Sequence, residues 1–216
     1  MLDEYTVPDY QHAALVTIDV QHSTLEGGSL EIRGTRDAAS RIKDVASLFR
    51  ENGWPIVHVV RLYQPDGSNA ELCRRRALEQ GAEFFLVGTT GRALAEELLP
   101  RTGIELNDRS LLAGGMQQIG PLEWVMYKPR WSAFYATPLE SHLRSYGVTT
   151  VVVSGCNFPN CPRATLFDAS ARDFRSVLIS DAVSRFDDLG QHEMNGIGVL
   201  VVDAAAFVAS ARSLES

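Results

Sequence analysis

Hydrophobic residues along this chain gather in short continuous runs, separated by longer stretches in which they recur at helical spacing. The runs predict six strands, at residues 13–20, 55–60, 123–128, 149–154, 176–179 and 198–202. Their apolar residues are continuous rather than alternating, as expected for strands buried on both faces of a parallel sheet. The stretches between them are long enough for crossover helices, and such connections are nearly always right-handed.

The intervening stretches carry apolar residues three and four positions apart, as amphipathic helices do. This spacing predicts helices at residues 37–51, 137–146 and 204–212 and from residue 162 onwards, with shorter ones at 70–79, 92–99 and 191–195. Strands that alternate with helices predict a doubly wound, three-layer α/β/α sandwich around a mostly parallel six-stranded sheet. At this length we expect a single domain over residues 1–216.

Residues typical of N-caps predict where three helices begin. Thr137 is predicted as an N-cap, with Pro138 in the first helical position and Glu140 in the capping-box position. Asp203 is predicted to cap the last helix, and Cys161 the helix that Pro162 begins. The starts of three helices are therefore expected from local sequence alone.

Residues 61–123 have the least regular pattern. The stretch contains Pro65, Gly67 and the basic run of residues 74–76, which is typical of a solvated helix face. A connection this long in a compact domain is usually a functional lid or binding loop, or it contains short elements of its own. The sequence leaves both alternatives open.

Composition narrows the class of protein. The chain is 45% hydrophobic and 22% charged, as globular proteins are, and its formal net charge of −7 argues against nucleic-acid or anionic-membrane partners. Acidic residues near the start and the lack of an apolar run of about 18 residues predict neither a signal peptide nor a membrane span. Three cysteines disfavour a disulfide scaffold. We therefore expect a cytoplasmic protein.

Three reactive side chains stand at the ends of predicted strands. Asp19 and Lys128 end the first and third strands, and Cys161 follows the fourth after a short turn. The carboxyl ends of parallel strands face one crevice, so these side chains can meet. An ammonium group and a helix N-terminus favour a thiolate, and a carboxylate can exchange its proton. Taken singly, each residue also fits a structural role: Asp19 as a loop cap, Lys128 as a surface lysine and Cys161 as a buried cysteine.

Four segments together carry a family resemblance. They are Asp19 with Gln21, the segment KPRWSAFYATPLESHLRSYGV from Lys128, GCNFPNCPRATLFDA from Gly155, and SDAVS around Asp181. In this order and strand context they resemble the isochorismatase-like cysteine hydrolases, which include nicotinamidases, N-carbamoylsarcosine amidase and ureidoacrylate amidohydrolases. The resemblance implies the doubly wound fold described above.

The same resemblance implies roles for particular residues. Asp19, Lys128 and Cys161 would form the catalytic triad. A cis peptide bond between Cys156 and Asn157 would direct the N–H groups of Asn157 and Cys161 at one point, as an oxyanion hole. The turn at residues 157–160 and the proline after Cys161 depart from the usual family pattern, so no relative's substrate is transferred to this chain.

The activity implied is hydrolysis of a small-molecule amide, carbamoyl or ureido C–N bond through a thioester on Cys161. One alternative is isochorismate-type vinyl-ether hydrolysis, which Cys161 disfavours because relatives with that activity lack the cysteine. The other is a non-catalytic small-molecule-binding member of the same fold. We expect a homo-oligomer, a dimer or tetramer, with no nucleic-acid or membrane partner.

The resemblance also bears on metals and on the substrate pocket. Nicotinamidases add a metal site of an aspartate and several histidines after the second strand, where this chain has only His58 and Asp66. We therefore predict no metal and no cofactor. The residues expected to line the substrate pocket are Gln21, His22, Trp131, Phe134, Tyr135 and Arg163. Arg163 fits either a contact with a substrate carboxylate or a structural role.

Overall fold

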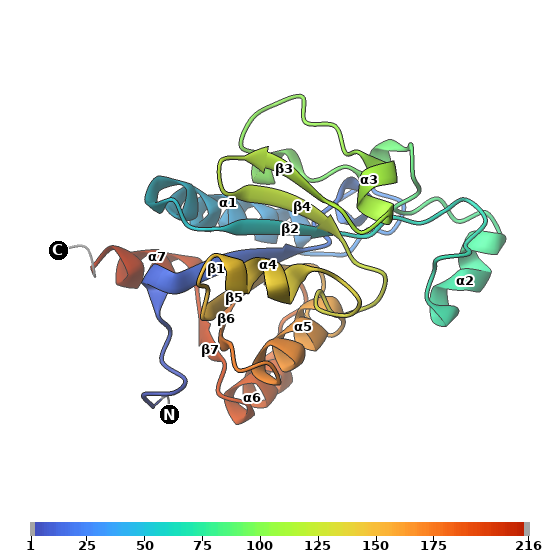
Figure 1. The fold of residues 1–216 in the computed structure, drawn as a ribbon. Helices are drawn as coiled ribbons and strands as arrows, with labels where there is room; N and C mark the ends of the chain where they lie inside the picture. The colour runs from blue at the N-terminus through green and yellow to red at the C-terminus, as the bar shows by residue number, and fades with distance from the viewer. Residues whose placement is uncertain (1–2, 214–216) are drawn as a thin grey trace.

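A computed structural model describes residues 3–213 as one sheet of seven strands between layers of helices (Figure 1). The strands are β1 Ala13–Ile18, β2 Ile56–Val60, β3 Met116–Gly120, β4 Glu123–Tyr127, β5 Thr150–Gly155, β6 Arg175–Val183 and β7 Leu200–Val202. Their order is β3-β4-β2-β1-β5-β6-β7, and every neighbouring pair is parallel except β3 and β4. The predicted doubly wound, mostly parallel sheet is confirmed, but the predicted number of six strands is wrong.

The strand that the sequence pattern missed is β3, at the edge of the sheet. It pairs antiparallel with β4, and Ile119 is its one fully buried side chain. An edge strand that buries so little has no continuous apolar run, which is the signal that located the other six. The error in strand number therefore comes from the shallow burial of β3.

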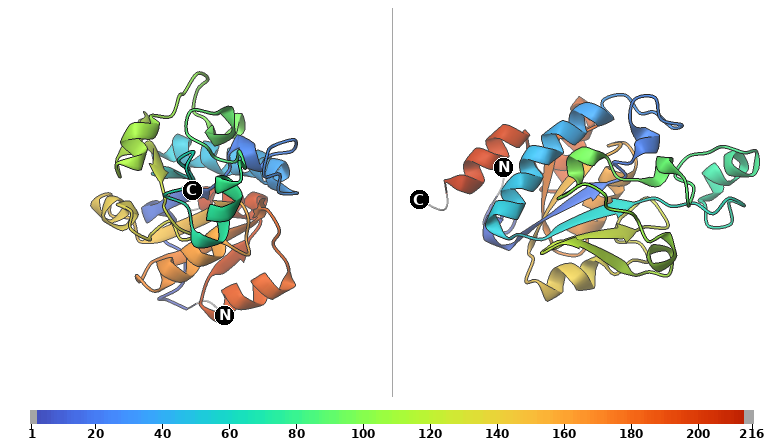
Figure 2. Two further views of the ribbon diagram at one scale, coloured as in Figure 1. Left: turned by 90° about the vertical axis from the view of Figure 1, so that its right-hand side faces the viewer. Right: turned by 90° about the horizontal axis from the view of Figure 1, so that it is seen from above.

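Helices cover both faces of the sheet. They are α1 Thr35–Asn52, α2 Leu72–Glu79, α3 Asp108–Leu112, α4 Leu139–Ser145, α5 Cys161–Ser170, α6 Asp188–Gly196 and α7 Ala204–Arg212. Leu15 packs in the core beneath α1 and α7, whereas its neighbour Val16 packs beneath α4, α5 and α6. The right-hand view of Figure 2 separates α1 and α7 from α4 across the sheet. None of the helices within residues 3–213 is long and apolar enough to cross a membrane.

Two helix starts differ from prediction. α4 begins at Leu139 with Pro138 as its N-cap, and the Thr137 hydroxyl donates a 2.5 Å hydrogen bond to the carbonyl of Ala133 and accepts a longer one, 3.4 Å, from the Leu139 N–H. Glu140 forms an ion pair with Arg172, which lies two residues beyond the end of α5, instead of completing a capping box. α5 begins at Cys161 itself, with Asn160 as N-cap. Cys161 is thus the first helical residue.

Three further elements have different bounds from those predicted. The helix expected at residues 92–99 is two 3-10 turns, η3 Thr90–Arg92 and η4 Glu96–Leu98. α6 is longer than the predicted 191–195, because Asp187 caps it by accepting from the Gly190 N–H at 2.8 Å. β6 continues to Val183 instead of ending at residue 179. The last helix and its Asp203 cap are confirmed.

Residues 61–123 contain short elements, which is one of the two alternatives left open. α2 stands away from the sheet in Figure 1, on an excursion with its own small core around Tyr63, Leu78 and Phe85. α3 and β3 lie closer to the body, over a second small core that includes Leu111 and Ile119. Several small clusters in place of one helix explain the irregular pattern of this segment.

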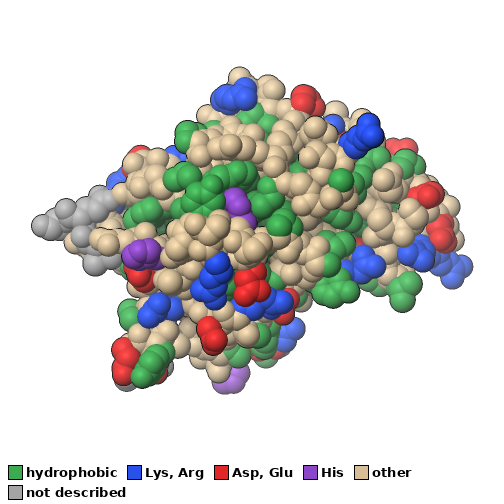
Figure 3. Space-filling model, viewed as in Figure 1, with side chains coloured by type: hydrophobic (Ala, Val, Ile, Leu, Met, Phe, Trp, Pro, Cys, Tyr) green, Lys and Arg blue, Asp and Glu red, His purple; other side chains and the backbone are tan. Residues whose placement is uncertain are grey.

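Hydrophobic side chains gather over β3, β4 and α4 on the face seen in Figure 3. Within this region the ring of Trp124 contacts those of His142 and Tyr146, with centroids 4.5 and 5.2 Å apart. Such aromatic contacts add to the area that they bury. They fasten α4 to the strand that delivers Lys128.

Candidate active site

The three predicted triad residues meet at one edge of the sheet. Asp19 follows β1, Lys128 follows β4, and Cys161 begins α5 beyond β5. Lys128 Nζ donates a 2.7 Å hydrogen bond to Asp19 Oδ2 and lies 3.3 Å from Cys161 Sγ. The residues are 5%, 0% and 3% exposed in the same order. β1 and β5 are neighbours in the sheet, but the chain continues from β1 toward one edge and from β5 toward the other. Ligands of open α/β sheets bind at such a switch in strand order.

Unusual backbone conformations place Asp19 and the turn that leads to Cys161. Asp19 has a φ of +52°, a conformation that non-glycine residues seldom adopt, and its N–H donates to the carbonyl of Val59 at 2.9 Å. At Gly155 φ is +118°, and a side chain there would collide with the backbone of Ile18. Glycine is therefore required where β5 passes β1 and the chain turns toward Cys161.

The charges of the site favour an ionised carboxylate beside a neutral thiol. Burial opposes ionisation of Asp19, but the nearby charges of Lys128 and Arg61 outweigh it and lower the pKa of the carboxyl. Burial raises the pKa of Cys161 to about 11; Lys128 acts against this rise and Asp19 adds to it. Burial outweighs the influence of Lys128, which was expected to favour a thiolate, and the charge of Lys128 is also paired with Asp19.

One carboxylate oxygen remains available. Asp19 Oδ2 is bound to Lys128, whereas Oδ1 is buried and has no hydrogen-bond partner among residues 3–213. A buried acceptor without a partner is costly in a folded protein. This oxygen is suited to accept a proton from a neighbouring group.

The turn before Cys161 has the conformation that the family resemblance implied. The peptide bond between Cys156 and Asn157 is cis. Across the described part of the chain, the N–H groups of Asn157 and Cys161 donate to no protein acceptor. Two N–H groups without partners beside a nucleophile are the donors that an oxyanion hole needs. Their action on a substrate stays a prediction.

Two predicted pocket residues come from the loop after β1. The Gln21 side chain donates to the carbonyls of Arg61 and Arg92 at 2.9 and 2.7 Å and accepts from the Arg61 N–H at 2.8 Å. It thus fastens three segments together. His22 is exposed and lines a hollow of about 540 Å³ with Ser23 and Glu83, and this hollow includes no triad residue.

The other four predicted pocket residues differ in exposure. Trp131 is partly buried, and Tyr135 is 56% exposed. Phe134 lies in the core, where it stacks on Phe174 with centroids 5.7 Å apart. Arg163 forms two bonds to the carboxylate of Glu193, at 2.6 and 2.8 Å. Contact of these residues with a substrate stays a prediction, and Arg163 would have to leave its partner to make one.

Arg61 is a residue of this site that the sequence analysis did not identify. It is fully buried, and its guanidinium lies 2.7 Å from Glu71 and donates to the Lys128 carbonyl at 3.2 Å. Glu71 also accepts from the Tyr63 hydroxyl at 2.6 Å. Arg61 directly follows β2, so the strand-end rule that located the triad also pointed to it. It supports the loop of Lys128 and the charge of Asp19.

The histidine on β2 is occupied by protein partners. His58 Nδ1 lies 2.8 Å from the Thr17 hydroxyl, and Nε2 lies 2.7 Å from Glu123 Oε1. Within residues 3–213, no group of three or more His, Cys, Asp or Glu side chains is placed to hold a metal ion. The residues near the triad thus offer charge and hydrogen bonds rather than a ligand set.

Comparison with known proteins supplies the family. The sequence profile of the isochorismatase domain matches residues 13–209. The chain belongs to the isochorismatase family. Within this family, it is 30% identical over 178 residues to a protein of Arabidopsis thaliana named a probable inactive nicotinamidase, covering 81% of this chain and 82% of that protein.

Two further members of the isochorismatase family are similar over most of their length. Maleamate amidohydrolase of Pseudomonas putida is 30% identical over 185 residues, which are 84% of this chain and 76% of that protein. The crystal structure of an isochorismatase family protein from Desulfovibrio vulgaris superposes with a TM-score of 0.76 and 31% identity, covering 91% of this chain and 96% of that one. The resemblance stated from the motifs is confirmed.

Proposed function

We propose that this protein is a cysteine amidohydrolase that cleaves an amide, carbamoyl or ureido C–N bond of a small molecule. The observation that carries the proposal is the contact of one buried ammonium group, that of Lys128, with both Asp19 and Cys161. A nucleophile, a proton acceptor and a cation within bonding distance are the parts that covalent catalysis requires. Maleamate amidohydrolase, a relative named for amide hydrolysis, supports the bond type.

In the first half of the reaction, Cys161 Sγ attacks the carbonyl carbon while its proton passes to the Asp19 carboxylate. Because burial raises the pKa of the thiol, its attack is accompanied by transfer of its proton. The oxyanion that forms is held by the N–H groups of Asn157 and Cys161. Asp19 then gives the proton to the leaving nitrogen, the C–N bond breaks, and the acyl group remains as a thioester.

The second half of the reaction releases the acid. Asp19, ionised again, takes a proton from water as the water oxygen attacks the thioester carbon. The same two N–H groups hold the second oxyanion, and the sulfur leaves with the proton from Asp19. The ammonium of Lys128 contacts both Asp19 and Cys161 and stabilises whichever of the two is anionic.

Two alternatives fit the site less well. A vinyl-ether hydrolase does not need a cysteine nucleophile, whereas Cys161 is the residue on which the charged pair of this site converges. A non-catalytic binding module gains nothing from burying an ion pair against a thiol, because removing charges from water costs several kcal/mol per ion. The inactivity in the name of the Arabidopsis relative concerns that protein. The homo-oligomeric state, the cytoplasmic location and the single domain over residues 1–216 stay predictions.

The test is a screen of small amides, carbamates and ureides for released ammonia. Wild type should turn over at least one class, and quenched samples should contain an acyl group on Cys161 by mass spectrometry. The variant Cys161→Ala should be folded and inactive. The matched control is Cys156→Ala, because Cys156 is equally buried but contacts no ammonium group in the described chain. An active Cys161→Ala variant would overturn the proposal.

A further inference from the structure

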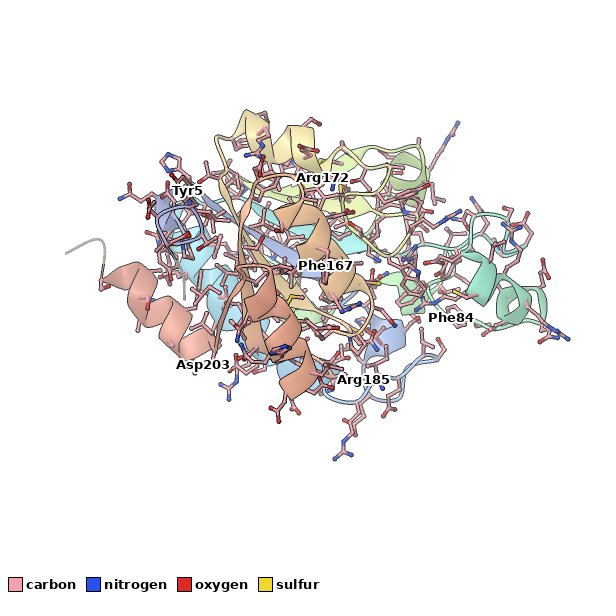
Figure 4. All side chains as sticks on the ribbon, turned by 90° about the horizontal axis from the view of Figure 1, so that it is seen from below. Tyr5, Phe84, Phe167, Arg172, Arg185 and Asp203 are labelled. Carbon is pink, nitrogen blue, oxygen red and sulfur yellow. The ribbon has the colours of Figure 1, made fainter. Side chains whose placement is uncertain are left out.

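One arginine of the basic run points back toward the body of the protein. Arg74 lies on α2, and its guanidinium carbon is 5.0 Å from the ring centroid of Trp131 and 5.9 Å from that of Phe84. Its Nη1 donates to the Tyr63 hydroxyl at 3.2 Å. Phe84 lies on the side of α2 that faces the body in Figure 4. The expectation of a solvated helix face therefore holds for the exposed Arg76 but not for Arg74.

Arg74 has no anionic partner. Within residues 3–213 it forms no ion pair, whereas Lys128 lies 2.7 Å from Asp19 and Arg61 lies 2.7 Å from its glutamate partner. Its hydrogen-bond partner Tyr63 is neutral, because burial raises the pKa of that phenol. A guanidinium carries five N–H donors, of which this one uses one for a protein bond. Arg74 is thus a half-buried cation with most of its hydrogen-bonding capacity unused.

The position of Arg74 relates it to the triad. Trp131, on which it lies, is three residues beyond Lys128 on the same loop. The Tyr63 hydroxyl that accepts from Arg74 donates to Glu71, and Glu71 pairs with Arg61, which donates to the Lys128 carbonyl, so a chain of polar contacts joins Arg74 to the triad. Counting Arg61 with its partner Glu71, three cations face two anions around the site. The excess positive charge favours an anionic ligand.

We propose that Arg74 binds a carboxylate of the substrate, so that the bond cleaved at Cys161 belongs to a small amide, carbamoyl or ureido acid. This inference rests on the proposed amidohydrolase function. A guanidinium whose carbon lies 5.0 Å from an aromatic ring centroid is attracted to the ring by its charge and can still donate a bidentate bond to a carboxylate. Arg163 is less suited to this task because its Nε and Nη2 already bind the carboxylate of Glu193.

The kinetic test uses matched pairs of substrates, N-carbamoylglycine with its methyl ester and succinamate with its methyl ester, and measures ammonia release. In wild type the acid of a pair should be preferred, and Arg74→Met should lower kcat/KM for the acid by about ten- to a hundredfold, the usual strength of a charged hydrogen bond. Activity on the ester should not change. Arg74→Lys should recover part of the preference, and the control Arg76→Met should keep all of it. Equal losses for acid and ester in Arg74→Met would refute the proposal.

A binding measurement separates this inference from the proposed function. Calorimetry on the Cys161→Ser variant gives the affinity for each acid and ester without turnover. If Arg74→Met lowers the affinity for the acid at least about tenfold, carboxylate recognition by Arg74 is supported. If wild type binds the acid in this way but releases no ammonia, only the hydrolase proposal fails. Equal or undetectable affinity for acid and ester in every pair overturns the role of Arg74. Melting temperatures of all variants confirm that they are folded.

Discussion

Replacing Asp19 by asparagine should make Cys161 more reactive toward alkylating agents while it abolishes hydrolysis. The pKa of the thiol is about 11 because burial dominates and because Asp19 pairs with the ammonium of Lys128 and repels a thiolate. Asparagine keeps the size of the side chain but removes the negative charge. Lys128, 3.3 Å from the sulfur, then has the thiolate as its natural partner.

The size of the effect follows from two opposing terms. A nearby opposite charge lowers a pKa by about one to three units, so a fall of about two units is expected in the Asp19→Asn variant. At pH 8 this multiplies the thiolate population by about a hundred. A less basic thiolate is also a weaker nucleophile, by about eightfold over two units. Alkylation of Cys161 should therefore become about tenfold faster at pH 8.

The assay follows iodoacetamide labelling of Cys161 against pH by mass spectrometry. Cys73→Ser and Cys156→Ala should be present in all proteins compared, because Cys73 is exposed and would also be labelled. Turnover of Asp19→Asn should be lost, since no group then takes or returns the proton. A labelling midpoint that is unchanged or higher in Asp19→Asn would refute the account, because it would mean that the ion pair does not hold the thiol neutral.

Three further outcomes are expected. Lys128→Met should raise the thiol pKa further and abolish turnover; a labelling profile equal to that of wild type would show that Lys128 does not act on the thiol. Chelators should leave activity unchanged, and a loss restored by zinc would contradict the metal-free prediction. Glu123 has its pKa lowered from 4.5 to about 2: burial opposes ionisation, but bonds from Arg50 and His58 outweigh it. The pH-dependent part of its contribution to stability, which Glu123→Gln lacks, should therefore be fully present above pH 4.5 and be lost as the pH falls through 2, as denaturant unfolding at several pH values would show.

The sequence by itself determined the layers of the fold and the location of the triad. Continuous apolar runs identify strands buried on both faces, and parallel strands place their carboxyl ends at one edge. Asp19, Lys128 and Cys161 were therefore expected to meet, and their contacts confirm it. These features are local in origin, because each depends on the pattern within one strand and on the residue that follows it.

Only the tertiary structure decided the protonation of Cys161 and the partners of the arginines. The pKa of the thiol depends on burial and on two charges that lie 33 and 142 residues away in the sequence. The place of Arg61 directly after β2 pointed to the site, but its partner Glu71 and the contacts of Arg74 lie in a segment whose small clusters have no periodic pattern, so they could not be anticipated from spacing. β3 was missed for a related reason, since an edge strand with one buried side chain has no apolar run. The spacing of apolar residues indicates which face of one helix or strand is buried. Charge pairing instead depends on residues that the fold brings together from distant parts of the chain.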